Sequence, residues 1–193
     1  YAHARDFYSQ EEDVLNQVAA EAAFVDGAVF SHHKLAEAAG NGTDNIHTAV
    51  ISMGTPTFGK RCTEVSATTA VVYIGRLSNE KNPGSLVELA EALPEVQFIL
   101  VGGGPMQEEL EKRTQNLANF RLIGSLHGKD ALDTWRQPGH IFIQPSRSEG
   151  LSLALLEAMD RCMIPLVTGV GGQTEPLPAT HLTGIPSSIT ARE

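Results

Sequence analysis

Between residues 71 and 168 the chain alternates short apolar runs with segments of helical periodicity, and this alternation is the strongest constraint on its fold. The apolar runs are nearly continuous, which is typical of strands buried on both faces. Strands that alternate with helices pair in parallel, so the pattern predicts an α/β fold with a doubly wound parallel sheet. The expected strands are 71–74, 96–101, 120–123, 141–143 and 164–168, and the expected helices are 86–93, 106–116, 131–135 and 151–159.

The first 58 residues carry a separate set of expected elements. These are an alanine-rich helix over 11–25, a strand over 27–31, a helix over 32–39 and a strand over 46–52. Residues 59–69 are polar and lack periodicity, so we interpret them as a linker. The sequence therefore predicts two units, residues 1–58 and residues 59–193.

The charge and hydropathy of the chain argue against two classes of protein, those that bind nucleic acid and those that span a membrane. The chain has 193 residues, 41% of them hydrophobic, which is enough for a substantial core. Its 14 Lys and Arg against 23 Asp and Glu argue against nucleic acid as a partner, because phosphate contacts need clustered cations. The sequence shows no apolar run of about 18 residues and no signal-peptide pattern, so we expect no transmembrane segment.

The cysteines and histidines give no sign of a metal site. Cys62 and Cys162 form neither a C-x-x-C pair nor a metal-spaced pair, so we expect reduced thiols, a cytoplasmic location and no zinc. The seven histidines form no cluster of ligands either. Because the chain opens on Tyr1 and not on Met, we expect it to be a piece of something longer.

Glycine or a small polar residue follows every strand expected between residues 71 and 168. Because the carboxyl ends of parallel strands meet at one edge, we expect these loops to form a single cleft. The first loop holds Arg76 and Lys81, a guanidinium and an ammonium that can both reach one diphosphate. A solvated surface loop is the alternative for this segment. The other loops contain Gly102–Gly104, Gly124–Leu126, Glu149–Ser152 and Gly169–Glu175.

Residues 148–159 join a strand end, a glycine turn and an apolar helix that carries two carboxylates. The start of such a helix offers unpaired backbone N–H groups and the positive end of the dipole, which attract a phosphate. Glu149 lies at the mouth of this loop, and Glu157 lies two turns along the helix. Carboxylates accept charge-assisted hydrogen bonds from sugar hydroxyls, worth roughly 1.5–3 kcal/mol each. Solvated carboxylates without a ligand are the alternative.

The Gly102–Gly104 loop allows a ligand to approach the backbone closely, but it is not a dinucleotide fingerprint. Gln107 stands where a third spaced glycine is needed, and no acidic residue ends a second strand at the expected distance. The sequence therefore disfavours a nicotinamide-dependent enzyme.

Taken together, these segments resemble the C-terminal donor-binding domain of retaining GT-B glycosyltransferases of group 1, the GT4 family. The resemblance rests on residues 75–81, the turn at 101–105, residues 146–159, and Gly171-Gly172 before Glu175. It implies a Rossmann-like fold, truncated at both ends, in which residues 59–193 bind a nucleotide-sugar. Residues 1–58 would form the tail of the acceptor-side domain and the crossing between the two domains.

The resemblance also implies a role for each residue. Arg76 and Lys81 would hold the donor diphosphate, and Glu149 would contact the transferred sugar, which makes these three the expected catalytic side chains. Glu157 would accept hydrogen bonds from the ribose hydroxyls, and Gly124–Leu126 would lie beside the base. The whole expected donor site is Gly75, Arg76, Lys81, Gly102, Gly103, Gly104, Gly124, Ser125, Leu126, Glu149, Gly150, Leu151, Ser152 and Glu157. No bound metal and no cofactor are implied.

The activity implied is hexosyl transfer by the full-length protein, with this chain inactive alone because the acceptor-binding loops are missing. The acceptor stays open as a glycan, a lipid or a small molecule, and so does peripheral contact of the full-length protein with a membrane. A non-catalytic nucleotide-sugar-binding or structural module with a degenerate site is the competing hypothesis. The sequence chooses neither the base nor the sugar.

Overall fold

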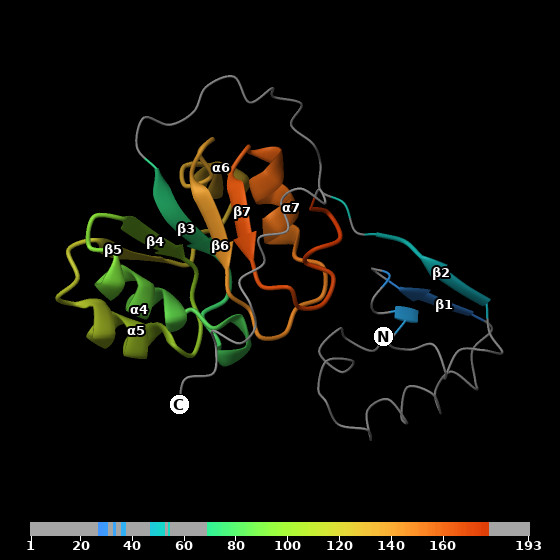
Figure 1. Cartoon of the computed structure of the whole chain (residues 1–193), viewed down its shortest axis with the longest axis horizontal. Coiled ribbons are helices and arrows are strands. Elements are labelled where there is room, and N and C mark those ends of the chain that lie inside the picture. The colour runs from blue at the N-terminus through green and yellow to red at the C-terminus, as the bar shows by residue number, and fades with distance from the viewer. Residues whose placement is uncertain are drawn as a thin grey trace.

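Five parallel strands form the larger sheet of the computed structural model (Figure 1). Each strand begins and ends within one residue of its expected bounds, which confirms the predicted α/β fold with a parallel sheet. The strands are β3 (Ala70–Ile74), β4 (Gln97–Val101), β5 (Phe120–Gly124), β6 (Ile141–Gln144) and β7 (Ile164–Val167). The structure describes residues 27–30, 33, 36–37, 47–52, 54 and 69–177.

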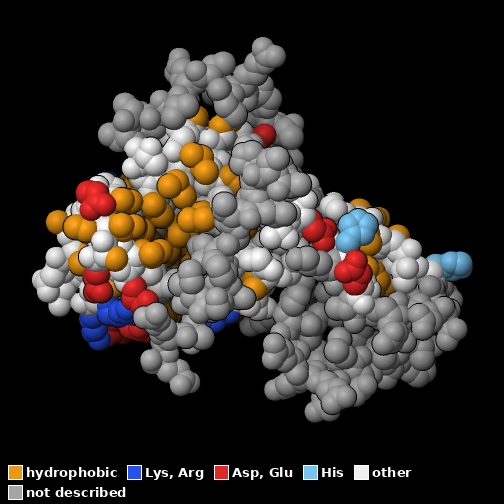
Figure 2. Space-filling model, viewed as in Figure 1, with side chains coloured by type: hydrophobic (Ala, Val, Ile, Leu, Met, Phe, Trp, Pro, Cys, Tyr) orange, Lys and Arg blue, Asp and Glu red, His pale blue; other side chains and the backbone are white. Residues whose placement is uncertain are grey.

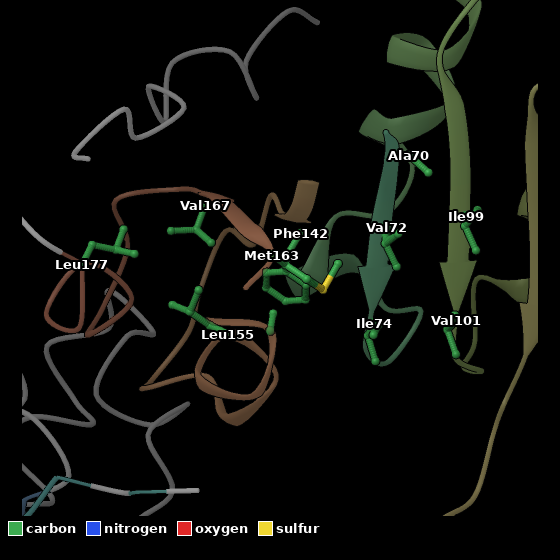
Figure 3. Packing of buried hydrophobic residues seen from close by; sticks show 11 residues of the cluster. Ala70, Val72, Ile74, Ile99, Val101, Phe142, Leu155, Met163, Val167 and Leu177 are labelled. Atoms are coloured by element: carbon green, nitrogen blue, oxygen red, sulfur yellow. The ribbon is translucent and has the colours of Figure 1, made fainter. Parts of the chain in front are cut away.

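Hydrophobic clusters cover both faces of this sheet, as its nearly continuous apolar strands predict. Along β3, Val71 and Tyr73 belong to a cluster with residues of α4 and α5, whereas Val72 and Ile74 belong to a cluster with residues of α7. Figure 3 shows the second cluster, which reaches from β3 and β4 across β6 to α7. The helices are η2 (Asn79–Lys81), α4 (Ser85–Ala92), α5 (Gln107–Thr114), α6 (Lys129–Asp133) and α7 (Leu153–Asp160).

The strand order β5-β4-β3-β6-β7 makes β3 the point where the winding of the sheet reverses. From β3 the chain adds β4 and β5 on one side, and it then crosses over to add β6 and β7 on the other. The loops that follow β3 and β6 therefore start from neighbouring strands and diverge from each other. Ligands of open α/β sheets bind at such a switch point.

The start of α7 differs from expectation. The apolar pattern predicts a helix from residue 151, but Ser152 is the N-cap and the helix begins at Leu153. The Ser152 hydroxyl accepts the backbone N–H of Leu155 at 3.3 Å, which satisfies one of the unpaired donors of the first turn. The helix therefore begins just past the loop that carries Glu149.

A smaller sheet lies beside the larger one, beyond α7 (Figure 1). Its two strands, β1 (Gly27–Phe30) and β2 (His47–Val50), pair in parallel and confirm the two strands expected in this region. Phe30 is buried against Ala28, Ala36 and Val50, apart from the two clusters of the larger sheet. The expected helix over 11–25, most of the linker and the predicted boundary at residue 58 lie outside the described residues.

Cys162 has an unusual backbone conformation and departs from one expectation. It adopts φ 59°, the left-handed conformation that usually favours glycine, and its backbone N–H donates to the carbonyl of Met159 at 2.9 Å. Cys162 is also disulfide-bonded, so the prediction of reduced thiols is wrong for this residue. Sequence spacing missed this because cysteines far apart in the chain can meet in the fold.

His140 precedes β6, and its Nδ1 is buried without a hydrogen-bond partner among the described residues. Burial lowers the pKa of His140 below its ordinary value. The imidazole of His140 is therefore neutral in the folded state, whereas in the unfolded chain it takes up a proton at about pH 6.5. The stabilisation from this group is present above that pH and is lost as the pH falls toward the folded-state pKa. We expect the free energy of unfolding to decrease from about pH 7 to about pH 5 and His140→Asn to reduce that decrease.

Urea denaturation at a series of pH values measures this slope. His127→Asn is the matched control, because it removes an imidazole that is exposed in the loop before α6. A His140→Asn variant with the pH slope of the parent chain would contradict the prediction.

Candidate functional site

The loops that follow the five strands are joined to one another along one edge of the sheet. Every neighbouring pair of loops shares at least one backbone hydrogen bond, so these loops adjoin one another, while the single cleft expected from them stays a prediction. The bonds are Leu77 N–H to Gly103 O at 3.0 Å, Gly102 N–H to Gly124 O at 2.8 Å, Arg147 N–H to Glu80 O at 2.7 Å and Gly172 N–H to Gly150 O at 3.1 Å.

The glycines of the loop after β4 pack against protein backbone. A Cβ on Gly102 would lie 1.8 Å from the carbonyl oxygen of Gly75, and one on Gly104 would lie 2.4 Å from that of Leu77. Side chains at these positions would therefore push apart the loops that follow β3 and β4. The expected reason for these glycines was a ligand close to the backbone, but the neighbouring loop alone accounts for them.

Tyr73 holds the backbone of the loop that follows β3. Its hydroxyl donates to the carbonyl of Arg76 at 2.6 Å, and its side chain is almost fully buried. Burial, together with the negative charges of Glu149 and Glu80, raises the pKa of Tyr73 well above its usual range, so the phenol stays protonated. Arg76 itself is exposed at the edge of the sheet. A fixed backbone therefore carries an exposed guanidinium.

Lys81 and Glu149 meet across the switch point. Lys81 ends η2 after β3, Glu149 lies in the loop after β6, and the Lys81 ammonium donates to Glu149 Oε2. The side chains are 22% and 11% exposed, so both are largely shielded from water. A cation and a carboxylate predicted from two separate loops thus form one ion pair.

Two residues that sequence reasoning missed also hold Glu149. Gln144 donates its Nε2–H to Glu149 Oε2 at 2.9 Å, and Ser146 donates its hydroxyl to the same oxygen at 3.2 Å. Both side chains are buried. With Lys81, three donors converge on Oε2, while Oε1 has no partner among the described residues. A polar residue that ends an otherwise apolar strand, as Gln144 does, is the signal that would have indicated this contact.

The backbone before α7 has open donors. No hydrogen bond from the N–H groups of Gly150, Leu151 or Ser152 is found within residues 69–177. These groups precede the first turn of α7, where the helix dipole favours negative charge. Leu151 and Ser152 have buried side chains, so the backbone is what this segment can offer to a ligand.

Glu157 belongs to a different set of contacts. It lies in the second turn of α7, and its Oε2 accepts a hydrogen bond from Arg136 in the connection between α6 and β6. Arg136 also lies 3.5 Å from Asp133, which in turn pairs with Arg161. The structure therefore joins Lys81 to Glu149 but leaves Glu157 in a separate network, and Arg136 is a further residue that sequence reasoning missed.

The segment expected beside a base follows β5. Gly124 ends that strand at φ 78°, and a Cβ there would meet nothing within 4 Å. The hydroxyl of exposed Ser125 would lie 2.4 Å from a Cβ on Gly103, while Leu126 packs on the hydrophobic cluster beneath α7. The segment thus combines open backbone with an apolar side chain.

The surface elsewhere is mixed in charge. Figure 2 shows hydrophobic side chains over β4 and α4, with acidic and basic side chains together along the lower edge near α5. There Lys112 pairs with Glu108 at 2.7 Å and Arg113 with Glu109 at 3.5 Å.

None of the helices described is long and apolar enough to cross a bilayer. Residues 69–177 and the shorter described segments hold no group of three or more His, Cys, Asp or Glu suited to a metal ion.

A family model described as glycosyl transferases group 1 matches residues 63–185 of the chain. The chain belongs to this family. The match spans the whole five-stranded sheet together with all the loops at its edge. The resemblance inferred from the loop motifs is therefore confirmed.

Two curated relatives of this group 1 chain each match a little more than half of it. Sulfoquinovosyl transferase SQD2 of Arabidopsis thaliana is 33% identical over 108 residues, which are 56% of this chain and 21% of that protein. One component of the human phosphatidylinositol N-acetylglucosaminyltransferase is 35% identical over 115 residues, which are 56% of this chain and 24% of that protein. The chain thus spans about a fifth to a quarter of the length of these two relatives.

Solved structures confirm that this group 1 chain has the α/β fold of a GT-B C-terminal domain. The pneumococcal O-GlcNAc transferase GtfA, in complex with UDP and GlcNAc, matches with a TM-score of 0.69 and 20% identity over 94% of this chain and 38% of that chain. HepE of Anabaena, in complex with UDP and glucose, matches with a TM-score of 0.70 and 19% identity over 91% of this chain and 53% of that chain. At these identities the likeness concerns the fold.

Proposed function

We propose that the edge formed by the loops after β3 and β6 binds the diphosphate and the sugar of a nucleoside diphosphate-sugar donor. The chain would then supply the donor side of a glycosyltransferase. The observation that carries this proposal is the Lys81–Glu149 ion pair at the switch point, held by Gln144 and Ser146. It places a cation suited to phosphate beside a carboxylate suited to hydroxyls. Because two solved structures of this fold contain UDP with a sugar, we propose a UDP-sugar as the donor.

The diphosphate would be held by charges of two kinds. Arg76 is exposed and Lys81 is half-buried, so a guanidinium and an ammonium face the ligand from one loop. The open N–H groups of 150–152, at the start of α7, would bind the phosphate oxygens from the other side of the switch point. The charge that develops on the diphosphate as it leaves would then be stabilised without a bound metal.

Glu149 suits the role of holding the sugar. Its Oε2 already accepts from Lys81, Gln144 and Ser146, so its charge is engaged and its orientation is fixed. We therefore assign Oε1 to accept a hydrogen bond from a sugar hydroxyl, and we assign no covalent bond between Glu149 and the sugar. Glu157 would accept hydrogen bonds from the ribose hydroxyls, and the 124–126 segment would lie beside the base.

The transfer itself would proceed with retention. The bond between the anomeric carbon and the diphosphate oxygen breaks, and the electron pair leaves with the diphosphate. The acceptor hydroxyl oxygen bonds to the same face of that carbon, and its proton passes to the departing phosphate oxygen. The acceptor would be bound by parts of a full-length protein that match the rest of the relatives' chains, so we expect this chain alone to be inactive.

A non-catalytic nucleotide-sugar-binding module is the second candidate. A transfer assay with a labelled UDP-sugar on the full-length protein separates the candidates, since turnover there would exclude a purely binding role.

Arg76→Ala is expected to weaken the binding of UDP about tenfold or more, the effect of losing one charge-assisted hydrogen bond. Its side chain is exposed, so we expect the stability of the fold to stay within about 0.5 kcal/mol of the parent chain. Isothermal titration calorimetry measures the affinity, and urea denaturation measures the stability.

Arg113→Ala is the matched control for this experiment. Arg113 lies in the last turn of α5 and pairs with Glu109, so its loss removes an equal charge from outside the proposed diphosphate contacts. The proposal would be wrong if Arg76→Ala bound UDP as tightly as Arg113→Ala does.

A further inference from the structure

A chain of alternating charges connects α6 with α7. Arg161 pairs with Asp133, Asp133 lies 3.5 Å from Nη1 of Arg136, and Nη2 of Arg136 donates to Oε2 of Glu157. Arg136 is the most buried member, with 5% of its side chain exposed, and Glu157 is the most accessible, with 35% exposed. The charge chain therefore ends at the surface in a carboxylate.

The buried guanidinium limits what Glu157 can do. Arginine keeps its charge in proteins, and a buried charge without a partner is costly, so Arg136 must stay paired. Its partners among the described residues are Glu157 and Asp133, and its Nε has none there. One oxygen of Glu157 is thus committed to Arg136. The other oxygen, Oε1, has no hydrogen bond within the described residues.

We infer that Arg136 is a positioning residue for recognition of the donor ribose, acting through Glu157. This inference rests on the proposed function, in which Glu157 accepts hydrogen bonds from the ribose hydroxyls. A carboxylate on a helix surface otherwise samples several rotamers, and ordering it on binding costs free energy. By holding Oε2, Arg136 fixes the rotamer in advance and presents Oε1 in one orientation. The resulting gain in binding free energy is confined to ligands that carry ribose hydroxyls.

The test compares UDP with 2′,3′-dideoxy-UDP, which lacks those hydroxyls. In the parent chain we expect UDP to bind about tenfold more tightly than the dideoxy ligand. In Arg136→Met we expect the affinity for UDP to fall about tenfold, with the affinity for dideoxy-UDP changed less than about twofold. The ratio of the two affinities would therefore approach one. Isothermal titration calorimetry measures both ligands on each variant.

Arg161→Met is the matched control, because Arg161 belongs to the same charge chain and its guanidinium pairs with Asp133. It should keep the ratio of the parent chain. A purely structural role for Arg136 would weaken both ligands equally and leave the ratio unchanged, and that result would overturn the inference. Failure of the parent chain to bind UDP at all would instead overturn the proposed function.

Two further variants keep the test decisive if Arg136→Met does not fold. Glu157→Gln retains the guanidinium and should also bring the ratio close to one, and Arg136→Lys, which keeps a charge but fewer donors, should give an intermediate ratio. The inference is overturned if either of these variants discriminates between the two ligands as strongly as the parent chain does.

Discussion

Gly102→Ala is expected to lower the free energy of unfolding by about 4 kcal/mol, which is a large effect for one methyl group. The new Cβ would lie 1.8 Å from the carbonyl oxygen of Gly75, far inside contact distance. Overpacking of this kind costs about 1–3 kcal/mol and sometimes more. Gly102 also has φ 150°, which side chains rarely adopt, and such strain adds about 1–3 kcal/mol.

The displacement would reach the proposed site. Gly75 donates its N–H to Val101 at 3.0 Å, and Leu77 donates to Gly103 at 3.0 Å, so separating the two loops breaks bonds that place Arg76. We therefore expect the binding of UDP to weaken together with the stability. Urea denaturation followed by circular dichroism measures the unfolding free energy.

Gly169→Ala is the control for the same chemical change. Gly169 is exposed after β7, and a Cβ there would meet nothing within 4 Å. This variant should stay within about 0.5 kcal/mol of the parent chain. The packing argument fails if Gly102→Ala is as stable as Gly169→Ala.

Lys81→Met is expected to reduce both stability and ligand binding. Glu149 is 11% exposed and would lose its cation while keeping its charge, which we expect to cost about 2–3 kcal/mol in a partly buried pair. The proposed contact with the diphosphate would be lost as well, so the affinity for UDP should fall about tenfold or more. Denaturation and calorimetry of the same protein separate the two effects.

The double variant Lys81→Met with Glu149→Gln tests whether the unpaired Glu149 carboxylate causes the loss of stability. Removing the second charge relieves the unpaired carboxylate, so its destabilisation should be smaller than the sum of the two single changes. Lys112→Met serves as the control, because Lys112 pairs with Glu108 on an exposed helix face and should cost less than about 0.5 kcal/mol. Strict additivity of the Lys81 and Glu149 changes would contradict the proposed coupling.

The fold was predictable because its signals are local. Every strand from β3 to β7 is a short, mainly apolar run that ends in, or is followed directly by, glycine or a polar residue, and no distant information is needed to recognise one. The loops at the strand ends follow from the parallel pairing alone, and so does the expectation that Lys81 and Glu149 lie on the same edge.

The contacts within the site were not predictable in the same way. The partners of Glu149 include Lys81, which is 68 residues away in sequence, and the partner of Glu157 is Arg136, which comes from another connection. Such pairings depend on how the loops fold over the edge, and residue types at given spacings do not encode that. The disulfide at Cys162 was missed for the same reason.

The pairing of β3 with β6 at the switch point has the fewest residue pairs of any in the larger sheet. Val71–Ile141 and Val72–Phe142 are the two residue pairs that join β3 to β6, whereas five pairs join β3 to β4. Two contacts lie just beyond this pairing and connect the loops that follow β3 and β6. They are the Lys81–Glu149 ion pair and the hydrogen bond from Arg147 to Glu80. A ligand that contacts both loops would span the boundary between β3 and β6. Its binding free energy would then oppose the shearing apart of the two halves, so that occupancy of the site and integrity of the sheet are linked.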